Sequence, residues 1–194
     1  MVCIPRSIVK GIMLFLVLIP FNCGMPASES ISMDLDLQES YAFENNDGYK
    51  PIKYLFIHCS ASSSRARLRG KDIMKIAKQR GFQRPPYHFF LPRSGEVDTL
   101  CRLNGDQIIS PEELCWGVAG VNSFSIHICL ESCFVDYPES KIDSRNYIQT
   151  VNLERLIRYY KAQVPGIIVQ GHRDYPGVRK LCPGFNAKSE YSTL

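Results

Sequence analysis

The sequence predicts an α/β fold: a single domain over residues 51–194, built on a mixed central β-sheet flanked by helices. Short apolar stretches rich in β-branched and aromatic residues alternate with two amphipathic stretches, and this alternation is typical of strands and helices in one domain. The chain is 45% hydrophobic and 22% charged, as globular proteins are. Because strands and helices alternate unevenly, the sheet is expected to be mixed.

Four buried strands are predicted, since each stretch is short, apolar and bounded by turn residues. The second is expected to pass through a turn at Ser94-Gly95 into a further strand over 97–102, which forms a hairpin with it. The four stretches cover residues 53–59, 87–91, 125–130 and 167–170.

Two helices are predicted from apolar residues that recur at helical spacing. The first covers 71–80 and stops at Gly81. The second covers 146–164 and ends before Pro165-Gly166. The apolar stripe of the second helix consists of Leu153, Leu156, Ile157, Tyr160 and Val164.

The N-terminus, residues 1–27, is predicted to be an export signal. Arg6 and Lys10 precede an uncharged run over 11–21, which falls short of the roughly 20 apolar residues that span a bilayer. Cys23, two residues after the run, is a candidate lipid acceptor, and ordinary cleavage a few residues later is the alternative. We therefore expect an exported protein in the periplasm or cell envelope, lipid-anchored at Cys23, or secreted, with no transmembrane span in the mature chain.

Residues 28–50 are predicted to form an acidic, flexible linker. The whole chain carries +4, residues 1–23 carry two positive charges and residues 24–49 carry six negative ones, which leaves +8 on residues 50–194. A basic domain suits an anionic partner, and both nucleic acid and cell-wall polymer qualify. Because the basic residues are scattered and form no run, we expect the polymer and no nucleic acid.

Eight cysteines are many for 194 residues. Cys3 leaves with the signal, and Cys23 leaves as well or carries lipid, so six remain in the domain. In an oxidising compartment one or two disulfides are expected, but the sequence does not assign their pairing.

Two histidines and one cysteine are the candidate metal ligands: His58, His172 and Cys182. His58 lies near the end of a predicted strand and His172 directly follows another, where α/β sheets carry their sites. Imidazole and thiolate suit zinc, and a catalytic zinc keeps three protein ligands and one open position. Taken singly, each residue has a plainer interpretation as a core histidine, disulfide half or buried thiol.

Two further residues are candidates for catalysis beside the metal. Lys180 and Cys182 lie two apart, so an extended segment places both side chains on one face. The Tyr87 hydroxyl is a second candidate. The plainer alternatives are a solvated surface lysine for Lys180 and a core tyrosine for Tyr87. Alternation along the strands places Cys59 and His88 on the opposite faces from their neighbours, so neither is expected to be a ligand. His127, between two isoleucines, is predicted to be a packed or sheet-surface histidine.

Five motifs, in one order from about residue 52 to 187, resemble the zinc-dependent N-acetylmuramoyl-L-alanine amidases of type 2. That family includes phage lysozyme-type amidases and the peptidoglycan recognition proteins. The motifs are Ile57-His58-Cys59-Ser60-Ala61, Arg80-Gly81-Phe82 with Tyr87-His88-Phe89, Asn122 with Ser125-Ile126, Gly171-His172-Arg173-Asp174, and Lys180-Leu181-Cys182-Pro183-Gly184-Phe185.

The resemblance implies one Zn²⁺ held by His58, His172 and Cys182 in a surface cleft. It implies that Tyr87 and Lys180 stabilise the transition state while the amide between the lactyl group of N-acetylmuramic acid and L-alanine is cut. Peptidoglycan or muropeptides are then the partner. The chain itself is expected to be a monomer.

Trp116 and Asn122 are the predicted substrate-binding residues. Trp116 is expected to stack on sugar or peptide, and a core position is the alternative. Two other functions stay open: a non-catalytic peptidoglycan-binding protein of the same fold, and a disulfide-stabilised secreted protein without metal.

Overall fold

A computed structural model of the chain describes residues 50–63, 65–132 and 143–194. The predicted export signal, Cys23 and nearly all of the predicted linker lie outside the described residues. No helix in the described part combines the length and the apolar character needed to cross a membrane.

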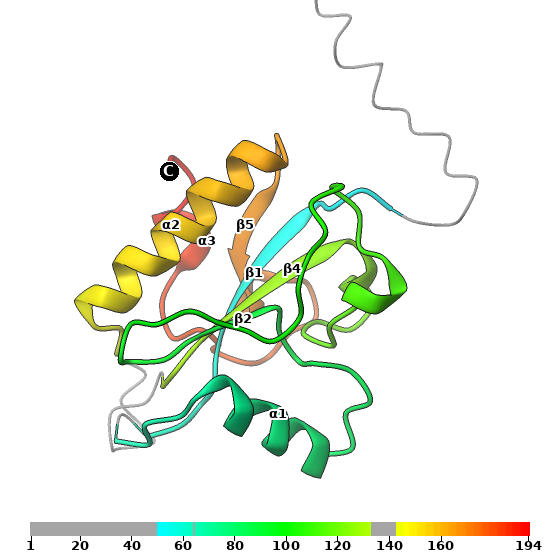
Figure 1. Ribbon diagram of the computed structural model, residues 1–194. Helices are drawn as coiled ribbons and strands as arrows, with labels where there is room; N and C mark the ends of the chain where they lie inside the picture. Colours follow the sequence, from blue (N-terminus) through cyan, green and yellow to red (C-terminus); the bar gives the residue numbers. More distant parts are fainter. Residues whose placement is uncertain (1–49, 64, 133–142) are drawn as a thin grey trace, which may run out of the picture. The chain divides into compact units, whose positions relative to one another are not determined.

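The centre of the domain is a five-stranded mixed sheet with the strand order β3-β2-β4-β1-β5 (Figure 1). Four strands run parallel, and β3 pairs antiparallel with β2. The predicted mixed sheet is therefore confirmed. The strands are β1 Tyr54–Cys59, β2 Phe89–Leu91, β3 Asp98–Thr99, β4 Ser125–Leu130 and β5 Ile168–Gly171.

The helix α2, Tyr147–Gln163, covers one face of the sheet (Figure 1). Asn146 caps it, because its side chain accepts a hydrogen bond from the backbone N–H of Gln149 at 2.9 Å. The buried amide of Gln149 donates to the carbonyl oxygens of Leu91 and Glu131, which ties the helix to the ends of β2 and β4. Leu153 and Ile157 of α2 are fully buried in the main core cluster.

The helix α1, Gly70–Gln79, packs against the opposite face, where Ile73 forms a cluster with Phe90 and Cys129. Its first turn is tied to β3, since the Gly70 N–H and the Arg69 guanidinium both donate to the carboxylate of Asp98. The remaining helical segments are short. They are η2 Pro111–Glu113, η3 Asn122–Phe124, η4 His172–Asp174 and α3 Ala187–Glu190.

The predicted hairpin strands, 87–91 and 97–102, are shorter in the structure. The His88 ring nitrogen Nδ1 accepts the backbone N–H of His127 at 3.0 Å, where a strand ladder would use a carbonyl. The His88 carbonyl accepts both Leu100 N–H and Cys101 N–H, which ends the pairing with the next strand. The His88 N–H still donates to the His127 carbonyl at 2.9 Å, so backbone pairing with β4 reaches His88, and alternation ceases to apply at Tyr87.

His88 itself is fully buried, and its Nε2 lies 2.9 Å from the carbonyl oxygen of Glu113. Because Nδ1 accepts from a backbone N–H, the proton of the neutral ring sits on Nε2 and is donated to that carbonyl. Burial lowers the pKa of His88 to about 4, and the hydrogen bond to Glu113 only partly opposes this. The folded chain therefore holds His88 neutral across the mildly acidic range.

Leu153→Ala is expected to lower the free energy of unfolding by about 2–5 kcal/mol, because it opens a cavity in the fully buried interface between α2 and the sheet. Arg158→Ala, on the exposed side of the same helix, is the matched control and is expected to stay within about 0.5 kcal/mol of the wild type. Urea unfolding followed by circular dichroism measures both. Equal losses in the two variants would contradict this packing.

The metal-free chain is expected to lose stability as pH falls from 7 to 5. The unfolded chain protonates His88 near pH 6.5 and the folded chain only near pH 4, so the unfolded state binds more protons in between. His88 alone then accounts for a loss of about 2 kcal/mol at pH 5. Urea unfolding in chelator at both pH values tests this, and His88→Asn should reduce the loss. An unchanged pH dependence in that variant would show that His88 is not responsible.

Candidate metal centre

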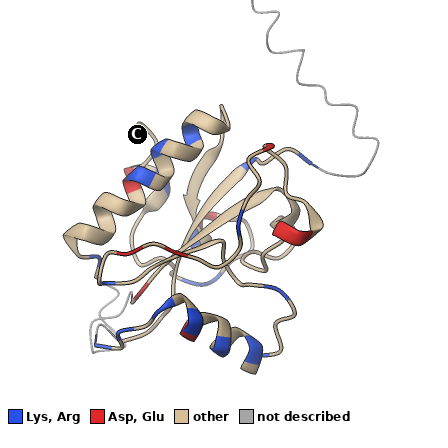
Figure 2. Ribbon diagram, viewed as in Figure 1, with Lys and Arg blue, Asp and Glu red and all other residues tan. Residues whose placement is uncertain are grey.

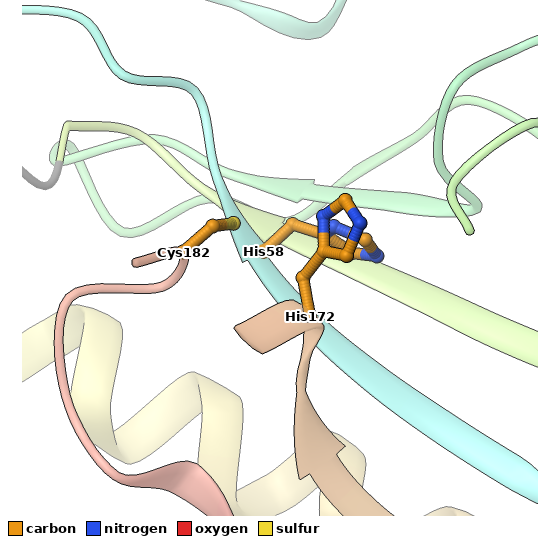
Figure 3. Close-up of side chains that lie close together, drawn as sticks. All are labelled: His58, His172 and Cys182. Carbon is orange, nitrogen blue, oxygen red and sulfur yellow. The ribbon is translucent and has the colours of Figure 1, made fainter. Parts of the chain in front are cut away.

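Three side chains from distant parts of the chain converge beyond the carboxyl ends of β1 and β5 (Figure 3). The ligand atoms of His58, His172 and Cys182 all lie within 4.8 Å of one another. Among the residues that the structure describes, this is the one group of His, Cys, Asp or Glu side chains with that geometry.

Strand pairing explains why the two histidines meet. In the parallel ladder between β1 and β5, Ile57 pairs with Gly171. The next residue in each segment is a histidine, His58 within β1 and His172 directly after β5, so the two side chains lie at the same level of neighbouring strands. Their ring centroids are 4.8 Å apart.

Cys182 is held in place by backbone hydrogen bonds. Its carbonyl accepts the N–H of Arg173 at 2.8 Å, which links its segment to the turn that carries His172. Its Sγ accepts the backbone N–H of Cys59 at 3.2 Å. A Cβ at Gly171 would lie 2.6 Å from Cδ of Pro183, so glycine is what allows the segment to approach the strand end this closely.

The protonation states suit a metal cation. Burial, and then the positive charges of His172 and Lys180, hold the pKa of His58 well below its usual range. Burial and Lys180 lower the pKa of His172 to about 4, so both rings keep a lone pair at neutral pH. Burial raises the pKa of the Cys182 thiol to about 11, although the Cys59 N–H and Lys180 favour the thiolate. A bound cation would supply the missing stabilisation, and two imidazoles with one thiolate are a donor set that fits zinc.

A cavity of about 780 Å³ opens above these groups. His172 and Cys182 line it, whereas His58 is only 1% exposed and lies beneath its floor. One side of α1 forms a wall, with Ile76 and Ala77 facing the cavity.

Tyr87 and Lys180 both line the cavity, close to the three candidate ligands. The Tyr87 ring lies 5.0 Å from the His58 ring, centroid to centroid. Burial, and then the neighbouring thiols of Cys129 and Cys182, raise the pKa of Tyr87 well above 10, so its hydroxyl keeps its proton and can donate. Lys180 lines the same cavity as His172 and Cys182, and its positive charge lowers the pKa of all three candidate ligands.

The two predicted substrate-binding residues differ in position. Trp116 lines the cavity with 41% of its surface exposed, and its ring lies 6.1 Å from that of Phe82. Asn122 is absent from the described cavity lining, and its Oδ1 accepts the backbone N–H groups of Gly117 and Val118. The contacts of Asn122 therefore order the loop after Trp116, and its direct contact with substrate stays a prediction.

The expectation that His88 points away from the face carrying the site is wrong. Its ring stacks on that of His127 at 5.7 Å, and the His127 ring in turn lies 5.3 Å from that of His58. The reason is that Tyr87 lies outside β2, so alternation cannot be counted from it. His88 lies two residues before Phe90 and shares its face, which through the pairs Phe90–Cys129 and His58–Cys129 is the face of the site. The candidate ligand set contains neither His88 nor His127.

The sequence does not reveal that His127 contacts a candidate ligand. Its Nδ1 lies 3.1 Å from Nε2 of His58, in the buried floor of the site. The available signal was its position in a predicted buried strand, but the face on which it lies depends on a register that sequence alone does not give.

Cys59 is disulfide-bonded, which agrees with the prediction that it is not a metal ligand. Three further cysteines of the described part are free and buried. They are Cys101, Cys115 and Cys129.

Comparison with curated proteins finds phage endolysins. The endolysin of Klebsiella phage KP32 is 28% identical over 134 residues, which are 69% of this chain and 82% of that protein. The endolysin of Enterobacteria phage T3 is 28% identical over 137 residues, with the same shares of both chains.

Comparison with solved structures shows the same fold. The N-acetylmuramoyl-L-alanine amidase LysC from Clostridium intestinale URNW superposes with a TM-score of 0.55 at 22% identity, covering 72% of this chain and 81% of that one. Apis mellifera PGRP-SA superposes with a TM-score of 0.56 at 19% identity, covering 75% and 86%.

The sequence profile of one protein family, described as N-acetylmuramoyl-L-alanine amidase, matches residues 48–185. The match includes all three candidate metal ligands as well as Tyr87 and Lys180. It spans the whole sheet and the cavity above its carboxyl edge. The chain therefore belongs to the N-acetylmuramoyl-L-alanine amidase family, hydrolases that act on peptidoglycan.

Proposed function

We propose that this amidase depends on zinc, held by His58, His172 and Cys182, and that it cuts the amide between the lactyl group of N-acetylmuramic acid and L-alanine. The observation that carries the proposal is the convergence of three ligand atoms within 4.8 Å, with His172 and Cys182 lining an open cavity. Three protein ligands leave a fourth position for water or substrate, as catalytic zinc sites do. When bound, zinc supplies a water of lowered pKa and polarises the substrate carbonyl.

The protein groups around this centre suit the charge that develops on the carbonyl oxygen. Tyr87 keeps its proton at neutral pH, so its hydroxyl donates a hydrogen bond to that oxygen. Lys180 adds a positive charge from another segment of the cavity lining. Neither group is a proposed metal ligand, so both remain available to the substrate.

The cavity and its rim suit a glycopeptide polymer. Trp116 offers an exposed aromatic face for stacking on sugar or peptide. Figure 2 shows basic residues along α1, and the exposed ones include Lys71, Lys75 and Lys78. Because the other side of α1 lines the cavity, these charges attract an anionic envelope polymer toward the site.

Export to the cell envelope is part of the proposal and rests on the predicted signal over residues 1–27, by cleavage or by lipid attachment at Cys23. A purely binding relative of the same fold is less well supported, since such a protein has no need of a complete ligand set with both donors beside it. The chain is proposed to act as a monomer.

Cys182→Ala is expected to abolish both zinc retention and turnover, because it removes the thiolate ligand. Metal content of the purified chain is measured alongside mass spectrometry of peptidoglycan digests, which detects released stem peptides that begin at L-alanine. Cys101→Ala, a buried free cysteine outside the ligand set, is the control and should keep zinc and activity. Wild-type cleavage by Cys182→Ala would overturn the proposed centre.

Tyr87→Phe and Lys180→Met are each expected to lower kcat by roughly 10²–10³ while zinc content stays at the wild-type level, since each removes one oxyanion donor. Lys188→Met, an exposed lysine of α3, is the control for loss of one positive charge. Steady-state rates on purified muropeptides give the comparison. If either site variant lost zinc, its role would be structural, and an unchanged kcat would remove it from the mechanism.

A further inference from the structure

We propose that His127 is a positioning residue: it accepts a hydrogen bond from Nε2–H of His58 and thereby fixes the tautomer in which His58 can bind a metal ion. The inference rests on the proposed zinc function, and it concerns a residue outside the three proposed ligands. It starts from a contact between two buried rings, with His58 Nε2 and His127 Nδ1 3.1 Å apart.

Strand pairing produces this contact. In the parallel ladder between β1 and β4, His127 pairs with Phe56, two residues before His58 and on the same face of the sheet. The His127 and His58 rings lie 5.3 Å apart, and both are at most 1% exposed. Water therefore does not compete for the hydrogen bond between them.

The direction of that hydrogen bond decides whether His58 can bind metal. A neutral imidazole has one N–H donor and one lone pair. Since Nε2 of His58 is engaged by His127, Nδ1 is the nitrogen left for a cation, and it must carry the lone pair. The proton then sits on Nε2 and is donated to Nδ1 of His127, whose own proton sits on its Nε2. The opposite direction would place a proton on Nδ1 of His58 and block the metal.

The His127 ring is held so that its Nδ1 meets His58. It stacks between Phe56 and His88, at 5.7 Å and 15° on one side and 5.7 Å and 19° on the other. Its backbone N–H is bound by His88. A Cβ at Gly117 would lie only 2.4 Å from Nδ1, so the glycine leaves the space that this orientation needs.

Packing alone does not account for a histidine at this position. Within residues 50–63, 65–132 and 143–194, Nε2 of His127 is buried and has no hydrogen-bond partner. A buried polar group without a partner lowers stability, so an apolar side chain would fill the same space at less cost. The hydrogen bond to His58 does need Nδ1 of His127. Ligating histidines commonly donate their other N–H to a polar acceptor, and here that acceptor is an imidazole nitrogen.

The first test compares zinc affinity in the full chain for His127→Leu and His127→Asn, measured by competition with a chromophoric chelator. Leucine has no acceptor, so zinc binding should weaken by about 10–100-fold, the usual effect of losing such a partner. Asparagine can place Oδ1 where Nδ1 stood, so it should restore most of the affinity. Urea unfolding of the zinc-free chains should show His127→Leu to be no less stable than the wild type. Wild-type zinc affinity in His127→Leu overturns the proposal.

The second test does not depend on the folding of a variant. In the zinc-loaded wild type, nitrogen NMR of labelled histidines should show His58 with Nε2 protonated and Nδ1 bound to metal. A protonated Nδ1 would overturn the proposal.

Two further variants complete the tests. Gly117→Ala, which displaces the His127 ring, should weaken zinc binding in the same direction as His127→Leu. Cys182→Ala separates the two levels: if it keeps wild-type zinc affinity, the proposed metal centre itself is wrong, whatever the His127 variants do.

Discussion

The parallel pairing of β1 with β4 on one side and β5 on the other determines the geometry of the whole site. It brings His58 beside His172, because Ile57 pairs with Gly171. It also brings His127 onto the same face of the sheet, because Phe56 pairs with His127. A shift of one residue in either ladder would turn a histidine to the α2 face and separate these groups. The apolar packing of α2 therefore stabilises the register on which the chemistry at the other face depends.

The two faces of the sheet differ in what they contribute. Leu153 and Ile157 of α2 close an apolar core on one face. The other face carries a row of buried rings, from His88 through His127 to His58, which burial keeps neutral. Neutral imidazoles are good ligands and poor sources of stability, because each costs desolvation and must find a partner. The domain thus concentrates its buried imidazoles on the face that carries the proposed metal centre and its largest apolar core on the opposite face.

The strands and helices with strong apolar patterns were predictable, and the irregular connection between β2 and β3 was not. The strand at Ser125–Leu130 and the helix at Tyr147–Gln163 agree with the predictions, because periodicity reports burial directly. The shortening around His88 arises from a side chain that binds the backbone of a distant strand, which no local pattern reveals. Likewise the convergence of His58, His172 and Cys182 was expected from their motifs, whereas the contact of His127 required the register.

Two glycines allow neighbouring side chains to pack closely around the proposed metal centre. Gly171 admits Pro183, and Gly117 admits the ring of His127. In both places a methyl group would push away a residue that supports a proposed ligand, so these positions constrain the site without touching a metal. Burial raises the pKa of the Cys182 thiol to about 11, and the Cys59 N–H and the charge of Lys180 offset only part of this rise. A cation at the proposed centre would supply the positive charge that stabilises this desolvated thiol as its thiolate.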